Sequence, residues 1–307
     1  MHEIILHHYE FSPFSEKVRL AFGLKRLAWR SVLVPVWMPK PDLMPLTGGY
    51  RRAPVMQIGA DVYCDTQLIL RALERLHPEP SLFPGGARGV ASVLSFWWES
   101  NTFVTAARAL GAMIGDKLPP ELVEDRKTFL GFDMGKAAMA PGLPLFIQRL
   151  RAHFRWLEQM FSDGRPFALG AEASAVDLSA YHILWLLRRN IGAEIDALVP
   201  FGRLQGWYER VGAIGHGARS EMAAAEALDL AAAATPAPPD VEPEDGEAFG
   251  LVPGRRVSVT PDDTGRDPVV GTLVAAGAEE IVLRRADPRV GEVNVHFPRA
   301  GYEAVPA

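Results

Sequence analysis

The sequence predicts three successive structural regions: a small mixed α/β domain, an all-helical domain and a small all-β domain. Residues 1–82 alternate strand and helix signals, residues 88–228 show helical periodicity, and residues 251–307 contain only short strands separated by turns. An acidic segment rich in Pro and Ala, residues 229–250, is expected to be a semi-extended linker. A chain of 307 residues is long enough for two or three domains.

The first domain is predicted to be a small mixed sheet with helices packed on it. Its elements follow the order β-α-β and then β-β-α. A helix is expected to begin after Asp65, where apolar residues keep helical spacing up to Leu76. The expected strands are residues 3–9, 29–36, 53–58 and 62–64, the last two forming a hairpin, and the first helix covers residues 15–24.

The helical domain and the tail differ clearly in their patterns. Helices are predicted within residues 92–113 and 145–161, and a third begins at Ser174-Ala175-Val176-Asp177, whose spacing approximates a capping box. The tail instead carries about five short strands, which is typical of a small SH3-like barrel. Its Arg residues are nearly balanced by acids, so we expect a protein-interaction module or a cap rather than a nucleic-acid-binding domain.

Composition excludes several classes of protein. The net charge of −5 disfavours nucleic acid and anionic membranes as partners, and no apolar run is long enough to span a bilayer. The N-terminus does not resemble a secretory signal. A single cysteine, Cys64, excludes an internal disulfide framework and is expected to be an inert core thiol. These features predict a cytoplasmic protein.

The most informative stretch is Phe11 to Arg19, which lies between the first strand and the first helix. Ser12 suits the N-cap position because its hydroxyl can accept from a backbone N–H of the first turn, and Pro13 suits the first helical position. Such a helix start favours an anion. The hydroxyl of Ser12 can either cap the helix or point at a ligand.

Residues 1–228 resemble a cytosolic glutathione S-transferase, with a thioredoxin-like domain followed by a helical one. The tail after residue 250 lies outside this resemblance. The matching motifs occur in the order of the family: Ser12-Pro13-Phe14-Ser15 with Val18-Arg19 is similar to the serine-type stretch of the tau and zeta classes, Ala53-Pro54-Val55 to the cis-proline motif, Asp65-Thr66 to the acidic–serine pair, and Ser174 with Asp177 to the capping box of the helical domain.

The resemblance implies that Ser12 donates a hydrogen bond to the glutathione sulfur. Only the thiolate attacks, and lowering the thiol pKa by about two units takes roughly 3 kcal/mol. A hydrogen bond to a charged group contributes about 1.5–3 kcal/mol, and a helix N-terminus adds about 0.3–1 kcal/mol. Ser12 and its helix are therefore sufficient without a general base. The alternative is that Ser12 only caps its helix.

The resemblance also assigns residues to the ends of glutathione. A cis Pro54 would let the Ala53 backbone pair with the cysteinyl part, and Asp65 and Thr66 would hold the γ-glutamyl group. The alternative for Pro54 is an ordinary edge-strand proline, and the alternative for Asp65 and Thr66 is a helix cap. For the charged residues named next, the alternative is plain solvated charge. Arg52 and Lys40 would meet the glycyl carboxylate. The full predicted set is Phe14, Lys40, Arg52, Ala53, Pro54, Asp65 and Thr66.

An apolar electrophile pocket is expected from bulky residues of the helical region and its neighbours. These residues are Phe11, Trp97, Phe103 and Met113, for which a plain core role is the alternative. No metal site is expected, because His7, His8, His182 and His216 lack ligand spacing.

The sequence thus predicts a glutathione transferase, most simply a homodimer, that uses glutathione as co-substrate. The thiolate would attack an apolar electrophile or assist an isomerisation or cleavage. The alternative is a non-catalytic scaffold of the same fold that presents residues 251–307 to a protein partner.

Overall fold

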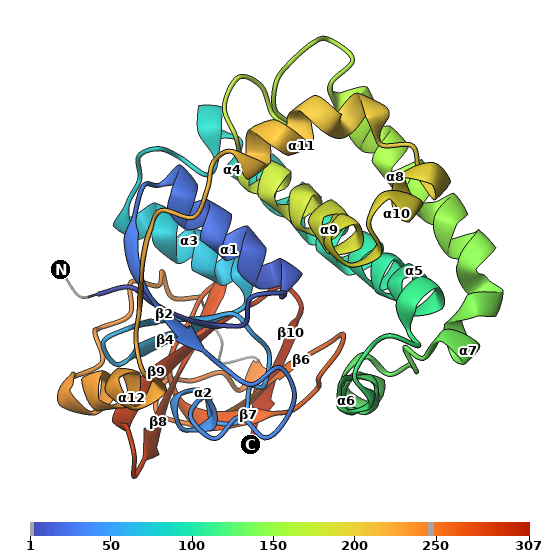
Figure 1. Cartoon of the computed structure of the whole chain (residues 1–307). Coiled ribbons are helices and arrows are strands. Elements are labelled where there is room, and N and C mark those ends of the chain that lie inside the picture. The colour runs from blue at the N-terminus through green and yellow to red at the C-terminus, as the bar shows by residue number, and fades with distance from the viewer. Residues whose placement is uncertain (1–2, 245–248) are drawn as a thin grey trace. The chain divides into compact units, whose positions relative to one another are not determined.

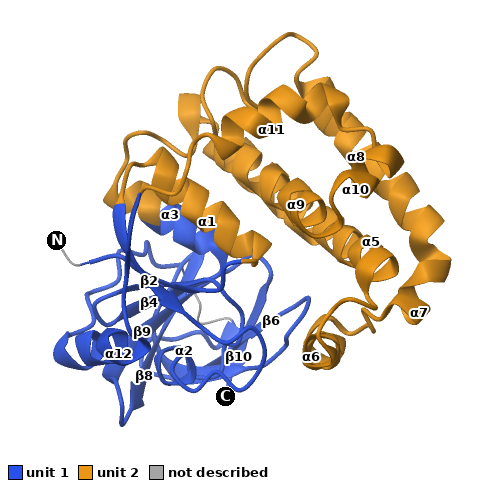
Figure 2. Ribbon diagram, in the orientation of Figure 1, with its two compact units in different colours: residues 1–10, 28–72, 218–307 blue, residues 11–27, 73–217 orange. Residues whose placement is uncertain are grey.

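The computed structural model describes residues 3–244 and 249–307 (Figure 1). The chain divides into two compact units, and each is discontinuous in sequence (Figure 2). Unit 1 consists of Met1–Glu10, Ala28–Ala72 and Ala218–Ala307, and unit 2 of Phe11–Leu27 and Leu73–Gly217. The predicted domain limits 1–82 and 88–228 therefore remain a prediction.

Unit 1 contains a ten-stranded sheet of the order β10-β6-β7-β8-β9-β4-β3-β1-β2-β5. Strand β1 pairs in parallel with β2 and antiparallel with β3, and β3 and β4 form the expected hairpin. The thioredoxin-like strand arrangement is thus confirmed. The strands of the N-terminal half are β1 (Ile5–His8), β2 (Ala28–Leu33), β3 (Val55–Ile58) and β4 (Asp61–Cys64).

The edge strand β5 (Ala218–Glu221) differs from the expectation that these residues belong to the helical region. It pairs in parallel with β2, and all four of its residues are exposed. A strand without an apolar face gives no period-2 signal, which explains why its sequence, Ala-Arg-Ser-Glu, does not reveal it.

The strand-rich C-terminal region is confirmed, but it does not form a sheet of its own. Its strands pair antiparallel with one another, β6 lying between β7 and β10. Strand β9 then pairs in parallel with β4, with Val62 opposite Val295. Residues 251–307 therefore continue the sheet of the N-terminal strands. Their limits as a domain and the SH3-like barrel remain predictions. The strands are β6 (Arg256–Pro261), β7 (Val269–Ala276), β8 (Glu280–Asp287), β9 (Gly291–Pro298) and β10 (Tyr302–Pro306).

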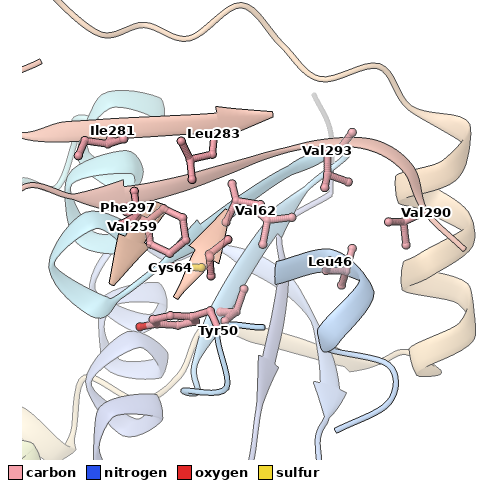
Figure 3. Close-up of a cluster of buried hydrophobic side chains, with 14 of the residues drawn as sticks. Leu46, Tyr50, Val62, Cys64, Val259, Ile281, Leu283, Val290, Val293 and Phe297 are labelled. Atoms are coloured by element: carbon pink, nitrogen blue, oxygen red, sulfur yellow. The ribbon is translucent and has the colours of Figure 1, made fainter. Parts of the chain in front are cut away.

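Both halves of unit 1 share one hydrophobic core (Figure 3). Leu46, from the short helix α2 (Met44–Thr47), and Val62 belong to the N-terminal half, whereas Ile281, Val293 and Phe297 belong to the C-terminal half; all are buried. Cys64 lies in the same cluster, and burial raises the pKa of its thiol well above the usual value. Its side chain is therefore the inert core thiol that the sequence indicates.

A buried polar cluster joins β4 to the C-terminal strands. Asp61 accepts from His296 Nε2 at 3.1 Å, and the other ring nitrogen of His296 lies 2.7 Å from Glu280 Oε1. Burial lowers the pKa of His296, but the hydrogen bonds to both carboxylates outweigh this effect and raise it. Both ring nitrogens of His296 thus contact carboxylates, one of them on β4, and these buried polar contacts favour the observed β4–β9 register.

The expected linker, residues 229–250, is docked on unit 1 wherever the structure describes it; residues 245–248 lie outside the described part. Helix α12 (Ala224–Ala233) extends beyond residue 229, where the linker was expected to begin. The Ala237 N–H then donates to Asp61 Oδ2 at 2.9 Å, and Asn294 Nδ2 donates to the Ala237 carbonyl at 3.0 Å. The extended chain is thus hydrogen-bonded to the sheet.

Unit 2 is the predicted helical bundle, and its central helix is α9 (Ala175–Ile191), which contacts α1, α4 and α5. Helix α3 (Thr66–Leu76) runs from unit 1 into unit 2. The remaining helices are α1 (Pro13–Leu24), α4 (Arg88–Trp97), a π-helical turn (Trp98–Thr102), α5 (Phe103–Ile114), α6 (Pro120–Leu130), α7 (Lys136–Met139), α8 (Leu143–Met160), α10 (Ala193–Leu198) and α11 (Gln205–Gly212).

The start of α9 confirms the pairing expected between Ser174 and Asp177. Asp177 Oδ2 accepts from the Ser174 N–H at 2.9 Å and from the Ser174 hydroxyl at 2.7 Å. Its other oxygen accepts from the Ala168 N–H and from Trp207 Nε1, both at 2.8 Å. One buried carboxylate therefore ties the helix start to two other segments of unit 2.

Candidate functional site

Ser12 is the N-cap residue of α1, as the sequence predicts. Its backbone is extended (φ −71°, ψ 121°), and its Oγ accepts from the Ser15 N–H at 3.1 Å. Pro13 occupies the first turn, where its missing N–H costs nothing. The residue is only 1% exposed.

Capping does not use up the hydroxyl of Ser12. As N-cap, the oxygen accepts with one lone pair, whereas the O–H hydrogen is a separate donor. Among the described residues, no hydrogen bond donated by this hydroxyl is found, and its acceptor role is the contact to Ser15. The capping role and a donor role toward an anion are therefore compatible in the same side chain.

The first turn of α1 carries its own charge compensation. Glu16 accepts from Arg19 Nη2 at 2.7 Å and from His216 Nε2 at 3.0 Å. Burial raises the pKa of Glu16, but the hydrogen bond from His216 and the charge of Arg19 outweigh this effect, so the pKa is lowered overall. Glu16 is thus ionised and paired, so its charge does not cancel the preference of the helix start for an anion.

Two aromatic residues predicted for different roles lie together in unit 2. The rings of Phe14 and Phe103 are 4.8 Å apart in an edge-to-face arrangement, and His182 is 4.8 Å from Phe14. Trp97 instead packs against His153, at 4.9 Å, and Trp156. Of the other expected pocket residues, Phe11 is exposed and Met113 is half-buried. The electrophile pocket remains a prediction.

Sequence reasoning missed a buried charged cluster in unit 2. Glu99, from the π-helical turn, accepts from Lys17 Nζ at 2.5 Å, and His182 Nε2 lies 3.4 Å from the same oxygen. Burial raises the pKa of Glu99, but the charge of Lys17 outweighs this effect, and the pKa falls to about 2. The only sequence signal was a Lys within the otherwise apolar face of α1.

Glu99→Gln is expected to destabilise the protein, because it removes the carboxylate that pairs with the buried Lys17 ammonium. Breaking such a pair costs about 3–5 kcal/mol. Urea unfolding of the variant, beside the double variant Lys17→Met/Glu99→Leu, measures this cost. The double variant should recover much of the loss, since it buries no charge. A Glu99→Gln variant as stable as the wild type would contradict the assignment of a stabilising pair.

In unit 1, the Ala53–Pro54 peptide bond is cis, as the resemblance implied. Asp65 follows β4 and has a positive φ of 75°, a conformation that non-glycine residues rarely adopt. Its Oδ1 accepts from the Gln67 N–H at 2.8 Å, which caps the start of α3 at Thr66. Strained residues of this kind cluster at ligand sites, so the backbone at Asp65 supports a functional role.

The charged residues expected to hold the ends of glutathione already have partners within unit 1. Arg52 Nη2 donates to Asp263 Oδ1 and to the Thr264 carbonyl. Asp65 Oδ2 accepts from the Tyr302 hydroxyl at 3.1 Å. Lys40 Nζ donates to the Arg51 carbonyl at 2.8 Å. The C-terminal strands thus contribute residues to this region, and sequence reasoning missed all of them.

The comparisons with known proteins agree with the fold. The family model of the glutathione S-transferase N-terminal domain matches residues 6–81, and that of the C-terminal domain matches residues 123–210. A crystal structure of a GST-like protein from Pseudomonas syringae is 37% identical, covers 100% of both chains and superimposes with a TM-score of 0.76. The chain belongs to the glutathione S-transferase family.

Two further relatives are more distant. FtsZ-localized protein A of Caulobacter vibrioides is 27% identical over 186 residues, which are 58% of this chain and 74% of that protein. A glutathione S-transferase of Ceriporiopsis subvermispora, solved in complex with glutathione, is 19% identical over 70% of this chain and 98% of its own, with a TM-score of 0.53; it shows the fold alone. Within residues 3–244 and 249–307, no helix is long and apolar enough to cross a membrane.

Proposed function

We propose that the chain is a glutathione transferase in which the Ser12 hydroxyl stabilises the glutathione thiolate. The observation that carries the proposal is the geometry of Ser12: its oxygen caps α1, while its O–H hydrogen is not committed to another described group. A thiolate at a helix start gains both this hydrogen bond and the favourable end of the helix dipole.

The remaining roles are those that the family resemblance implies. The thiolate would attack an apolar electrophile, for which Phe103 beside Phe14 offers an apolar wall. Ala53, Pro54, Asp65 and Thr66 would hold the cysteinyl and γ-glutamyl parts, and the strained φ of Asp65 supports this assignment. The enzyme would act in the cytoplasm as a homodimer.

A calorimetric titration of glutathione into the wild type and Ser12→Ala, with thiolate absorbance followed against pH, tests this proposal. Both proteins are expected to bind, and only the wild type should lower the thiol pKa. Ser15→Ala is the matched control, because the Ser15 hydroxyl is buried in the same turn and forms no hydrogen bond with a described residue. If Ser12→Ala lowers the thiol pKa of bound glutathione as far as the wild type does, Ser12 is only a helix cap.

A non-catalytic scaffold is the second candidate, and a separate observation favours it. Asp263 and Tyr302 engage Arg52 and Asp65, two residues that a glutathione-binding protein would need for its ligand. The relative FtsZ-localized protein A bears the name of a protein defined by its location rather than by a reaction. Absence of any glutathione binding by the wild type in the same titration would support this second function.

A further inference from the structure

The ion pair between Arg52 and Asp263 bears on which thiol this protein accepts. Arg52 Nη2 donates to the Asp263 carboxylate and, in addition, to the Thr264 carbonyl. The Arg52 side chain is 16% exposed, whereas that of Asp263 is 59% exposed. The guanidinium is thus largely enclosed, and the acid that reaches it comes from the segment between β6 and β7.

A second contact ties the same strands to the other expected ligand-binding residue. The Tyr302 hydroxyl donates to Asp65 Oδ2 and lies 3.0 Å from the Tyr50 hydroxyl. The Tyr302 ring is also 6.0 Å from Arg52 Cζ. Residues of β10 and of the β6–β7 segment therefore contact both Arg52 and Asp65, so the pair of Arg52 and Asp263 is not an isolated surface contact.

We propose that Asp263 is a specificity-determining residue, which occupies on Arg52 the place of a ligand's terminal carboxylate. The inference rests on the proposed binding of a glutathione-like thiol. A tethered carboxylate competes for Arg52 at a high effective concentration, so a ligand's terminal carboxylate gains no ion pair there. The protein is accordingly expected to accept a glutathione-like thiol equally well whether its glycyl end is charged or uncharged.

Calorimetry with glutathione and with its glycyl monoethyl ester, on wild type and Asp263→Asn, tests this assignment. The wild type should bind the two ligands with nearly equal affinity, because Arg52 is already neutralised. Asp263→Asn keeps the size of the side chain but removes its charge, so it should bind free glutathione about tenfold tighter than the ester. Adding Arg52→Gln to this variant should abolish the tenfold preference.

Glu303→Gln is the matched control, because Glu303 is an exposed acid of β10 that pairs with Arg266 and not with Arg52. It should leave the ratio of affinities near one. A wild type that already prefers free glutathione tenfold overturns the inference, and so does a ratio near one in Asp263→Asn, while glutathione binding itself stands in both cases. If neither ligand binds any of these proteins, the proposed transferase function fails together with the inference.

Discussion

A chain truncated after Gly250 is expected to lose the native fold of unit 1. The truncation removes β9 from the edge of β4 and exposes core residues such as Leu46 and Val62. Each fully buried Val, Leu or Phe side chain contributes about 1.5–3 kcal/mol, and a domain is stable by only about 5–15 kcal/mol. The burial free energy lost when several such residues lose their partners therefore exceeds the stability of the domain.

Circular dichroism and thermal unfolding of the truncated chain measure this effect. Co-expression of residues 1–250 with residues 251–307 is the control, and it should restore a folded complex. A soluble chain of residues 1–250 that unfolds cooperatively would show that the tail is an independent module, which is one of the two alternatives that the sequence leaves open. In the structure, residues of the tail are part of the core of unit 1 (Figure 3).

Replacing Asp177 with Ala is expected to destabilise the helical bundle of unit 2 strongly. The change leaves four donors without their acceptor: the N–H groups of Ala168 and Ser174, the Ser174 hydroxyl and the Trp207 indole. Breaking a buried network of this kind costs about 3–5 kcal/mol. The free energy of unfolding in urea measures it.

Asp163→Ala is the control for this experiment. Asp163 also accepts several hydrogen bonds from a neighbour, Arg165, but both side chains are exposed to solvent. Water replaces those bonds, so we expect little change in stability. If both variants unfold at the same urea concentration, the buried network does not stabilise the bundle.

Local signals in the sequence were sufficient for elements whose contacts are local. Ser12 and Pro13 mark the start of α1, and Ser174 with Asp177 marks the start of α9; in each case the cap and its partner lie within one helical turn. The hairpin of β3 and β4 likewise follows from the turn at Gly59. These features of the fold were predictable because short-range chemistry determines them.

The missed features all depend on contacts between distant parts of the chain. Asp263 meets Arg52 from 211 residues away, and in the sequence it looks like one more acid in a polar turn. Lys17 and Glu99 are 82 residues apart, and each alone suggests an exposed helix residue. Only the tertiary structure shows which charged residues pair. The contacts of Asp263 with Arg52 and of Tyr302 with Asp65 were therefore not predictable from the sequence.

The parallel pairing of β4 with β9 has a consequence for how the chain reaches its native state. Asp61 and Asn294, which face each other in this pairing, are 233 residues apart. During synthesis, the edge of β4 and the apolar residues beside it stay uncovered until the residues of β9 have left the ribosome. Non-local strand pairing is slow, and uncovered strand edges aggregate. The pairing of β9 with β4 is therefore expected to form late in folding, and chains that lack the C-terminal strands are expected to aggregate.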